Sequence, residues 1–273
     1  MSSNLLEVKD LVIKVHDNND IIVKDINFEV EKSKVLGIIG ESGSGKTMIC
    51  KSIMGLLDTK KFNIEGDIRY KHNNIIDLNE RNMEKIRGQD ISLIMQNPMT
   101  AFDPMTKIGT QIIESLRAHY SISRKEAYQK GISVLKKMNL GREEKIMNSY
   151  SNTLSGGMLQ RIMIAIAIML KSKIIIADEI TTALDASNKY MIIEELKKLR
   201  NSGITIVIIT HDFGVLSSIA DNIIVLNKGE IVESGSAKDI FYNPKEKYTQ
   251  ELLYASKLNG EYNGQSQKYF QTV

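Results

Sequence analysis

The sequence predicts an α/β fold built around a buried parallel sheet. Two continuous apolar runs rich in β-branched residues, 174–177 and 204–209, are typical of parallel strands covered on both faces. Residues 190–199 between them have helical spacing, which gives a strand–helix–strand unit. A third apolar run, 35–39, leads into a glycine-rich turn and a predicted helix over 48–57. A chain of 273 residues can form one large α/β domain or a core with a smaller subdomain.

Before the helical region, four further stretches have strand character. Residues 5–15 alternate loosely between apolar and charged side chains, which predicts a half-exposed strand, and residues 21–30 predict a second one. Residues 66–70 are strand-like, and residues 91–95 predict a buried strand that ends on Gln96.

A helical insert is predicted after this last strand. Pro98 and Pro104 punctuate its start, and the apolar residues from 108 to 116 and from 123 to 140 have helical spacing. Strands return near the C-terminus, where residues 223–226 and 231–232 flank a turn, and the polar tail beyond Lys257 is expected to be loose.

Composition narrows the class of protein. The net charge of +3 is too small to indicate nucleic-acid binding by itself, and the one cysteine, Cys50, excludes disulfides and cysteine-held iron–sulfur clusters within the chain. Charged residues interrupt the apolar N-terminal stretch, so we expect no signal peptide. The longest apolar run, 162–170, is far shorter than a membrane span. If the protein serves a membrane, we expect it to do so as a peripheral subunit.

The glycine-rich turn between the strand at 35–39 and the next helix predicts a nucleotide site. Its residues are Gly40, Glu41, Ser42, Gly43, Ser44, Gly45, Lys46 and Thr47. In this P-loop pattern the backbone N–H groups and the helix N-terminus bind phosphates, Lys46 reaches the β- and γ-phosphates, and Thr47 offers its hydroxyl to Mg²⁺. The alternative is a glycine-rich turn that precedes Lys-Thr by chance, and the strand–helix context disfavours it.

A P-loop needs a second acidic element, and Asp178-Glu179 follows a buried strand. We expect Asp178 to lie beside the P-loop and to hold Mg²⁺, while Glu179 polarises the attacking water. The alternative is an ordinary strand end with two carboxylates, which is common.

A third motif, residues 154–161, opens the apolar helix over 162–170. Ser155, Gly156 and Gly157 expose helix N-terminal N–H groups, which predicts a second anion site. One nucleotide needs only one phosphate cradle, so the second cradle suggests a nucleotide held by another subunit. A serine N-cap followed by a glycine turn is the alternative, and it explains Ser155 but not the double glycine or Gln160-Arg161.

With these motifs the sequence resembles the ATPase subunit of an ABC transporter over almost its whole length, and residues 154–161 match the family signature. The resemblance implies a RecA-like P-loop NTPase core with an antiparallel β subdomain and a helical insert. The implied boundaries are 1–96 and 161–235 for the ATP-binding core, 97–160 for the helical subdomain, and 236–273 for a C-terminal extension and tail.

The resemblance also assigns roles to three other residues. Gln96 falls at the Q-loop, which touches Mg²⁺ and water and relays to the membrane subunits, and Asp185 ends the D-loop at 182–185, which lines the dimer interface. His211 matches the switch histidine that contacts the γ-phosphate. A lone histidine after a strand is more often structural, but its order after Asp178-Glu179 favours the functional interpretation.

By resemblance, two such subunits bind two ATP molecules head to tail, each with Mg²⁺, on the cytoplasmic face of the cell membrane. Expected partners are two integral-membrane permeases, a second ATPase subunit (a heterodimer is favoured), and an extracytoplasmic substrate-binding protein. Residues 40–45, 96–104 and 240–253 resemble the oligopeptide/dipeptide/nickel importer group, and Met158-Leu159 is most similar to its nickel and metallophore ATPases.

Two departures from the family pattern affect these expectations. The usual adenine-stacking aromatic residue before the P-loop is missing, with His16 as a substitute, and Ile180 replaces the usual proline after Glu179. The alternatives are a soluble ABC-type ATPase that acts on nucleic acid or ribosomes, and a pseudo-ATPase that only gates a partner. The first usually has two cassettes or a long coiled coil, whereas this chain has one P-loop and one signature; Glu179 and His211 argue against the second.

Overall fold

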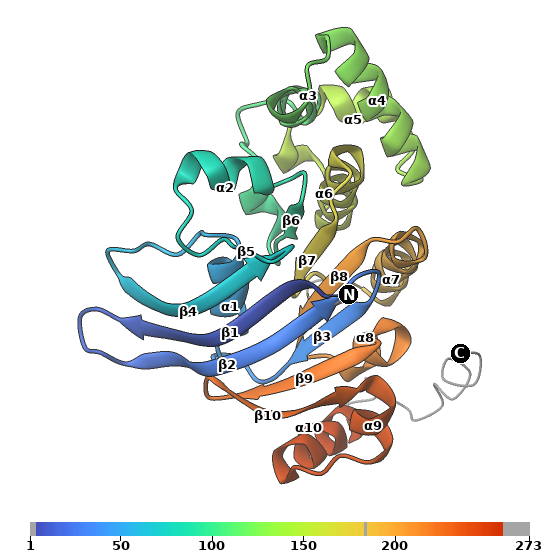
Figure 1. Cartoon of the computed structure of the whole chain (residues 1–273). Coiled ribbons are helices and arrows are strands. Elements are labelled where there is room, and N and C mark those ends of the chain that lie inside the picture. The colour runs from blue at the N-terminus through green and yellow to red at the C-terminus, as the bar shows by residue number, and fades with distance from the viewer. Residues whose placement is uncertain (1–3, 183–184, 259–273) are drawn as a thin grey trace. The chain divides into compact units, whose positions relative to one another are not determined.

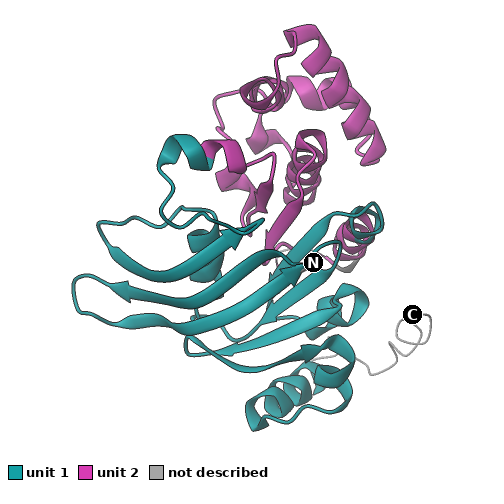
Figure 2. Ribbon diagram, in the orientation of Figure 1, with its two compact units in different colours: residues 1–83, 197–273 teal, residues 84–196 magenta. Residues whose placement is uncertain are grey.

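The computed structural model describes residues 4–182 and 185–258, which fall into two compact units (Figure 1). Unit 1 comprises residues 1–83 and 197–273, and unit 2 comprises residues 84–196 (Figure 2). The predicted loose tail lies outside the described residues. Among the residues that the structure describes, no helix combines the length and the apolar character needed to cross a bilayer.

Unit 1 contains an antiparallel sheet with the strand order β2-β1-β4-β5. Its strands are β1 (Asn4–Val15), β2 (Ile21–Glu31), β4 (Phe62–Tyr70) and β5 (Asn73–Asn74). The apolar residues that alternate along β1 are almost fully buried, and they are Leu6, Val8, Leu11 and Ile13. Burial of one face confirms the half-exposed strand that the alternation predicts.

Unit 1 also contains the strand that precedes the glycine-rich loop. This strand, β3 (Val35–Ile39), pairs in parallel with β8 (Thr205–Thr210) on one side and with β9 (Asn222–Asn227) on the other. All residues of β3 and β8 are buried, which confirms strands covered on both faces. The next strand, β10 (Glu230–Ser236), forms an antiparallel hairpin with β9.

The helices of unit 1 differ from the prediction in extent and number. Helix α1 (Lys46–Ile53) begins two residues before the predicted start at 48 and ends before 57. Three helices that the sequence did not predict follow the strands, and they are α8 (Phe213–Ile219), α9 (Ala237–Tyr242) and α10 (Lys247–Leu258). The first two have only seven and six residues, which is too short for a clear helical period.

Unit 2 combines a parallel strand pair with a group of helices. The strands β6 (Ile91–Ile94) and β7 (Ile174–Asp178) pair in parallel, and α6 (Gly156–Leu170) precedes β7. The remaining helices are α3 (Ile108–His119), α4 (Arg124–Lys137) and α5 (Glu143–Asn148), with short 3-10 turns at Pro98–Ala101 and Ser151–Thr153. Helix α4 begins at a capping box formed by Ser123 and Glu126.

The unit boundaries lie within helices α2 (Glu80–Ile86) and α7 (Ala186–Asn201). They differ from the domain boundaries that the resemblance implies, because unit 2 includes β6, α6 and β7 together with the helical insert. The domain boundaries at 96/97, 160/161 and 235/236 stay a prediction.

Candidate functional site

The glycine-rich loop of unit 1 requires glycine at two positions for different reasons. A Cβ on Gly40, directly after β3, would lie 2.1 Å from the carbonyl oxygen of Leu226 in β9, which no side chain could tolerate. Gly45 is the N-cap of α1 and has a φ of 102°, a left-handed conformation that glycine adopts without steric cost. The backbone of the loop therefore lies close to β9 at Gly40, and the helix begins directly after a left-handed glycine.

Lys46 is folded back onto this loop. Its side chain is only 4% exposed, and its ammonium donates to the carbonyl oxygens of Gly40, at 2.7 Å, and Glu41, at 2.8 Å. A buried ammonium needs such partners, but neutral carbonyls hold it less strongly than phosphate oxygens would. The next residue, Thr47, is exposed at the start of α1.

Two distant segments of unit 1 support the loop, and sequence reasoning missed both. The backbone N–H of Gly229, in the β9–β10 turn, donates to the carbonyl of Ser44 at 3.1 Å. From α10, the hydroxyl of Tyr248 accepts from the backbone N–H of Glu41 at 3.5 Å. In the sequence, only Gly229 could have indicated one of these contacts. The turn requires glycine at this position because a Cβ there would lie 2.3 Å from the carbonyl oxygen of Ile22.

In unit 2 the acidic pair lies at the carboxyl end of β7. Asp178 is the buried last residue of the strand, and Glu179 follows with a φ of 48°. A left-handed non-glycine residue costs about 1–3 kcal/mol, and such strain concentrates at functional sites.

The amide of Gln96 donates to the carboxylate of Glu179 at 2.9 Å. The two residues are brought together because β6 and β7 are parallel, so that their carboxyl ends share one edge of the pair.

The start of α6 presents the second predicted anion site. Ser155 is the N-cap, and its hydroxyl accepts from the backbone N–H of Met158 at 3.3 Å. Packing accounts for Gly157, because a Cβ there would lie 3.2 Å from the amide oxygen of Asn188 in α7. Packing does not account for Gly156, where a Cβ would meet nothing among the described residues closer than Pro98 at 4.0 Å. The exposed backbone at Gly156 is thus open to a ligand.

Gln160 links this helix to the acidic turn. It is 2% exposed within an apolar helix, and its amide donates to the carbonyl of Ile180, the residue after Glu179. Sequence reasoning noted Gln160 only as unexplained by a simple N-cap. The feature of the sequence that could have indicated this contact is a polar residue on the buried side of an apolar helix. Ile180, in the place of the usual proline, is itself buried.

Asp185 is held by Asn188, whose backbone N–H and side-chain amide donate to it at 2.8 and 2.7 Å. Both hydrogen bonds lower the pKa of Asp185, and the bond from the backbone N–H has the larger effect. Asp185 therefore stays ionised well below neutral pH. The predicted D-loop residues Ala183 and Leu184 lie outside the described residues.

The two histidines of interest both belong to unit 1. His211 is exposed directly after β8, and the next residue, Asp212, caps α8. His16 is exposed at the end of β1, where its Nε2 lies 3.2 Å from the carbonyl oxygen of Thr59. This contact ties the ring to the neighbouring loop, and adenine stacking by His16 stays a prediction.

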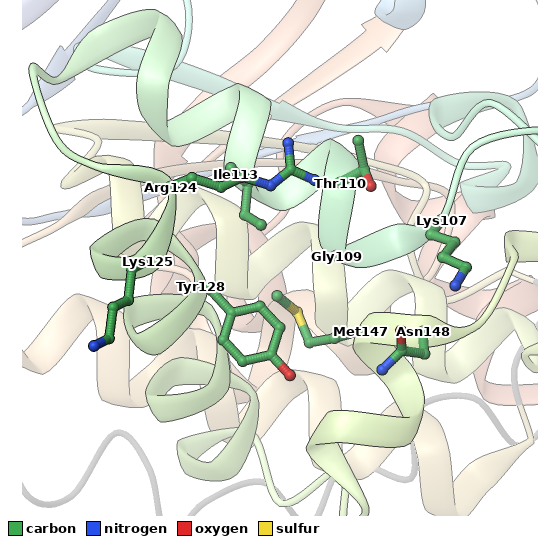
Figure 3. Close-up of a pocket in the computed structure, with 9 residues that line it drawn as sticks. All are labelled: Lys107, Gly109, Thr110, Ile113, Arg124, Lys125, Tyr128, Met147 and Asn148. Atoms are coloured by element: carbon green, nitrogen blue, oxygen red, sulfur yellow. The ribbon is translucent and has the colours of Figure 1, made fainter.

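A pocket of about 590 Å³ lies among the helices of unit 2 (Figure 3). It is lined by Lys107, Gly109, Thr110, Ile113, Arg124, Lys125, Tyr128, Met147 and Asn148. None of the described lining residues is acidic, and no ion pair is found for its three cations within the described part of the chain. Figure 3 shows Tyr128 and Met147 at the centre of the pocket and the three cations around it.

The candidate site residues thus divide between the units. Unit 1 holds the P-loop and His211, and unit 2 holds Gln96, Asp178, Glu179 and the start of α6. The hydroxyl of Thr47, the amide oxygen of Gln96 and the carboxylate of Asp178 are hard oxygen donors, the kind that Mg²⁺ prefers. No group of three or more His, Cys, Asp or Glu residues that could hold another metal was found in the described ranges.

Sequence comparison gives consistent matches. A family profile described as "ABC transporter" matches residues 23–182. The chain is 39% identical to the metal-staphylopine import system ATP-binding protein CntD of Staphylococcus aureus, over 93% of both chains. It is 38% identical to the oligopeptide transport protein OppD of Bacillus subtilis, over 92% of this chain and 71% of that one. It is 41% identical to the dipeptide transport protein DppD of Lactococcus lactis, over 91% of this chain and 72% of that one.

Solved structures agree with these matches. The dimeric post-hydrolysis structure of the ATP-binding cassette MJ0796, bound to ADP and Pi, superposes with a TM-score of 0.75 and 29% identity, over 85% of this chain and 98% of that one. The cbiO1 protein from Clostridium perfringens, which is part of an ABC transporter complex, has the same fold. It superposes with a TM-score of 0.75 and 22% identity, over 94% of this chain and 96% of that one.

Proposed function

Because the chain belongs to the ABC transporter family, as one of its ATP-hydrolysing cassettes, we propose that it powers uptake of nickel, metallophore complexes or oligopeptides across the cell membrane. The observation that supports import is the similarity to importer ATPases over more than nine-tenths of this chain. The identities of 39% to the metal-staphylopine protein and 38% to the oligopeptide protein favour neither substrate. The three curated relatives named above are ATP-binding proteins of import or transport systems, which favours transport over an action on nucleic acid or ribosomes.

In this proposal the P-loop binds the phosphates of ATP. Lys46 leaves the carbonyls of Gly40 and Glu41 and donates to the β- and γ-phosphates, while the N–H groups of residues 42–47 surround them. Thr47, Gln96 and Asp178 would hold Mg²⁺. When bound, this ion would supply positive charge to the phosphate oxygens.

Hydrolysis then requires an oriented water molecule. Glu179 accepts a proton from the water that attacks the γ-phosphorus, so that ATP and water give ADP and phosphate. In the structure the carboxylate of Glu179 accepts from Gln96, and the water would take the place of this amide. His211 contacts the γ-phosphate and senses its presence.

The second anion site acts on a partner's nucleotide. We propose that Ser155, Gly156 and Gly157 contact the γ-phosphate of ATP bound to a second ATPase subunit, and that Asp185 lines the interface. The open backbone at Gly156 supports this role, as does the dimeric structure of the similar cassette bound to ADP and Pi. A heterodimer is favoured over a homodimer by analogy with the importer group.

The pocket of unit 2 is the proposed contact with the two permeases. Lys107, Arg124 and Lys125 surround an apolar floor that includes Ile113 and Met147, which suits a short helix of a permease loop with acidic and apolar side chains. In this proposal the protein is a peripheral subunit at the cytoplasmic face of the membrane, with a substrate-binding protein on the other side.

Reversing the charge of this pocket should weaken the attachment to the permeases. We expect the Arg124→Glu, Lys125→Glu double variant to lose at least about 10-fold in affinity for permease-containing vesicles, because like charges would then face each other. ATP affinity should be unchanged, and acidic residues in the first turn of α4 favour the helix. The matched control is Lys136→Glu, Lys137→Glu, the same charge change in the last turn of α4. Equal vesicle binding by both variants would contradict this docking site.

The substrate is tested on the substrate-binding protein that the proposal pairs with this chain. Calorimetry with Ni²⁺, Ni²⁺–chelator complexes and short peptides separates the alternatives. Tight binding of the metal or its complex identifies nickel or metallophore import, and peptide binding identifies oligopeptide uptake. If none of these ligands binds, the proposed substrate classes are wrong.

A further inference from the structure

The C-terminal helix α10 contacts the phosphate-binding loop of its own unit. The hydroxyl of Tyr248, the second residue of α10, accepts from the backbone N–H of Glu41 at 3.5 Å, although the two residues are 207 positions apart. One side chain outside the P-loop motif thus contacts the backbone of a P-loop residue.

Tyr248 is held firmly in this position. The carboxylate of Glu233, in β10, accepts from the backbone N–H groups of Lys245 at 2.7 Å and Glu246 at 3.2 Å, which anchors the start of α10. Further along the helix, Leu253 is buried. Burial raises the pKa of Tyr248, and the charge of Glu41 adds to this effect, so the hydroxyl keeps its proton at neutral pH.

The peptide between Gly40 and Glu41 is held from two sides, at the carbonyl of Gly40 by the ammonium of Lys46 and at the N–H of Glu41 by Tyr248. In the proposed function Lys46 moves to the phosphates of ATP, which removes its hydrogen bond to Gly40. The contact with Tyr248 does not depend on Lys46 and can persist.

We propose that Tyr248 is a positioning residue for nucleotide binding, which keeps the first peptide of the P-loop in place while Lys46 transfers to the phosphates. This inference rests on the proposed role of the P-loop. It gives the C-terminal extension a direct part in ATP affinity, although Tyr248 touches neither the phosphates nor the attacking water.

The test is Tyr248→Phe, which removes only the hydroxyl. A hydrogen bond of ordinary net strength corresponds to an increase of about 2- to 10-fold in the Kd for Mg–ATP, measured by calorimetry on the full chain. In steady-state hydrolysis KM should rise by a similar factor, whereas kcat at saturating ATP should stay unchanged. A merely structural role would instead lower the unfolding temperature and the fraction of active protein.

A control variant makes the result specific. Tyr254→Phe changes the same residue type on the same helix, at a residue that is 65% exposed, and should leave the Kd unaltered.

Equal Kd values for Tyr248→Phe and Tyr254→Phe would overturn the inference. This outcome is distinct from failure of the proposed function, in which the unmodified chain itself would bind no ATP.

Discussion

Glu179→Gln is expected to bind ATP with unchanged affinity and to lose turnover by a factor of about 10²–10⁴, the usual contribution of a general base. Glutamine keeps the size of the side chain and can still accept the hydrogen bond from Gln96, so the turn after β7 should keep its conformation. What it lacks is a carboxylate that can accept the proton of the attacking water. With hydrolysis blocked, ATP should hold two subunits together as a long-lived dimer, which size-exclusion chromatography with Mg–ATP would detect.

The matched control is Glu114→Gln, the same change on the exposed face of α3 in unit 2. This variant should hydrolyse ATP at the normal rate and should not accumulate as a dimer. Normal turnover of Glu179→Gln, measured as phosphate release at saturating ATP, would contradict the role of Glu179 as general base. In that case the left-handed conformation of Glu179 would need another explanation.

The parts of the fold that could be predicted from the sequence are those with strong periodicity. The β-branched apolar runs of β3 and β8 favour buried strands, and the alternation along β1 favours a half-exposed strand. Helices α8 and α9 were missed because they are set by capping side chains, Asp212 and Ser236, rather than by a long apolar period.

In the candidate site, too, some residues could be predicted from the sequence and others could not. Motifs in which the chemistry depends on residues adjacent in sequence, such as the P-loop and Asp178-Glu179, could be found without a structure. Contacts between distant segments could not, because a side chain such as Tyr248 carries no local signal that its partner is Glu41. Gln160 is an intermediate case, since a polar residue within an apolar helix indicates a buried partner but does not identify the carbonyl of Ile180.

Ser155→Arg is the second change with a large expected effect, and its effect should appear in a different subunit. The side chain of Ser155 caps α6 through Met158, and a helix-capping hydroxyl contributes about 1 kcal/mol, so the variant should still fold. Binding of ATP to its own P-loop should be unchanged, because in the proposed function the start of α6 contacts only the partner's nucleotide. Hydrolysis of that nucleotide should fall by at least about 10²-fold, since arginine occupies the space of the γ-phosphate and displaces the N–H donors.

The assignment in trans is tested by mixing subunits. A Ser155→Arg subunit paired with a Glu179→Gln subunit combines one chain that lacks the signature serine with one chain that lacks the base. In the head-to-tail arrangement each active site takes its P-loop and base from one chain and its signature from the other. One site of this pair would then carry both defects and the other neither, so about half of the activity should return. If Ser155→Arg instead abolished nucleotide binding by the isolated subunit, the second anion site would act on its own chain's ATP. The open backbone at Gly156 would then serve binding in cis.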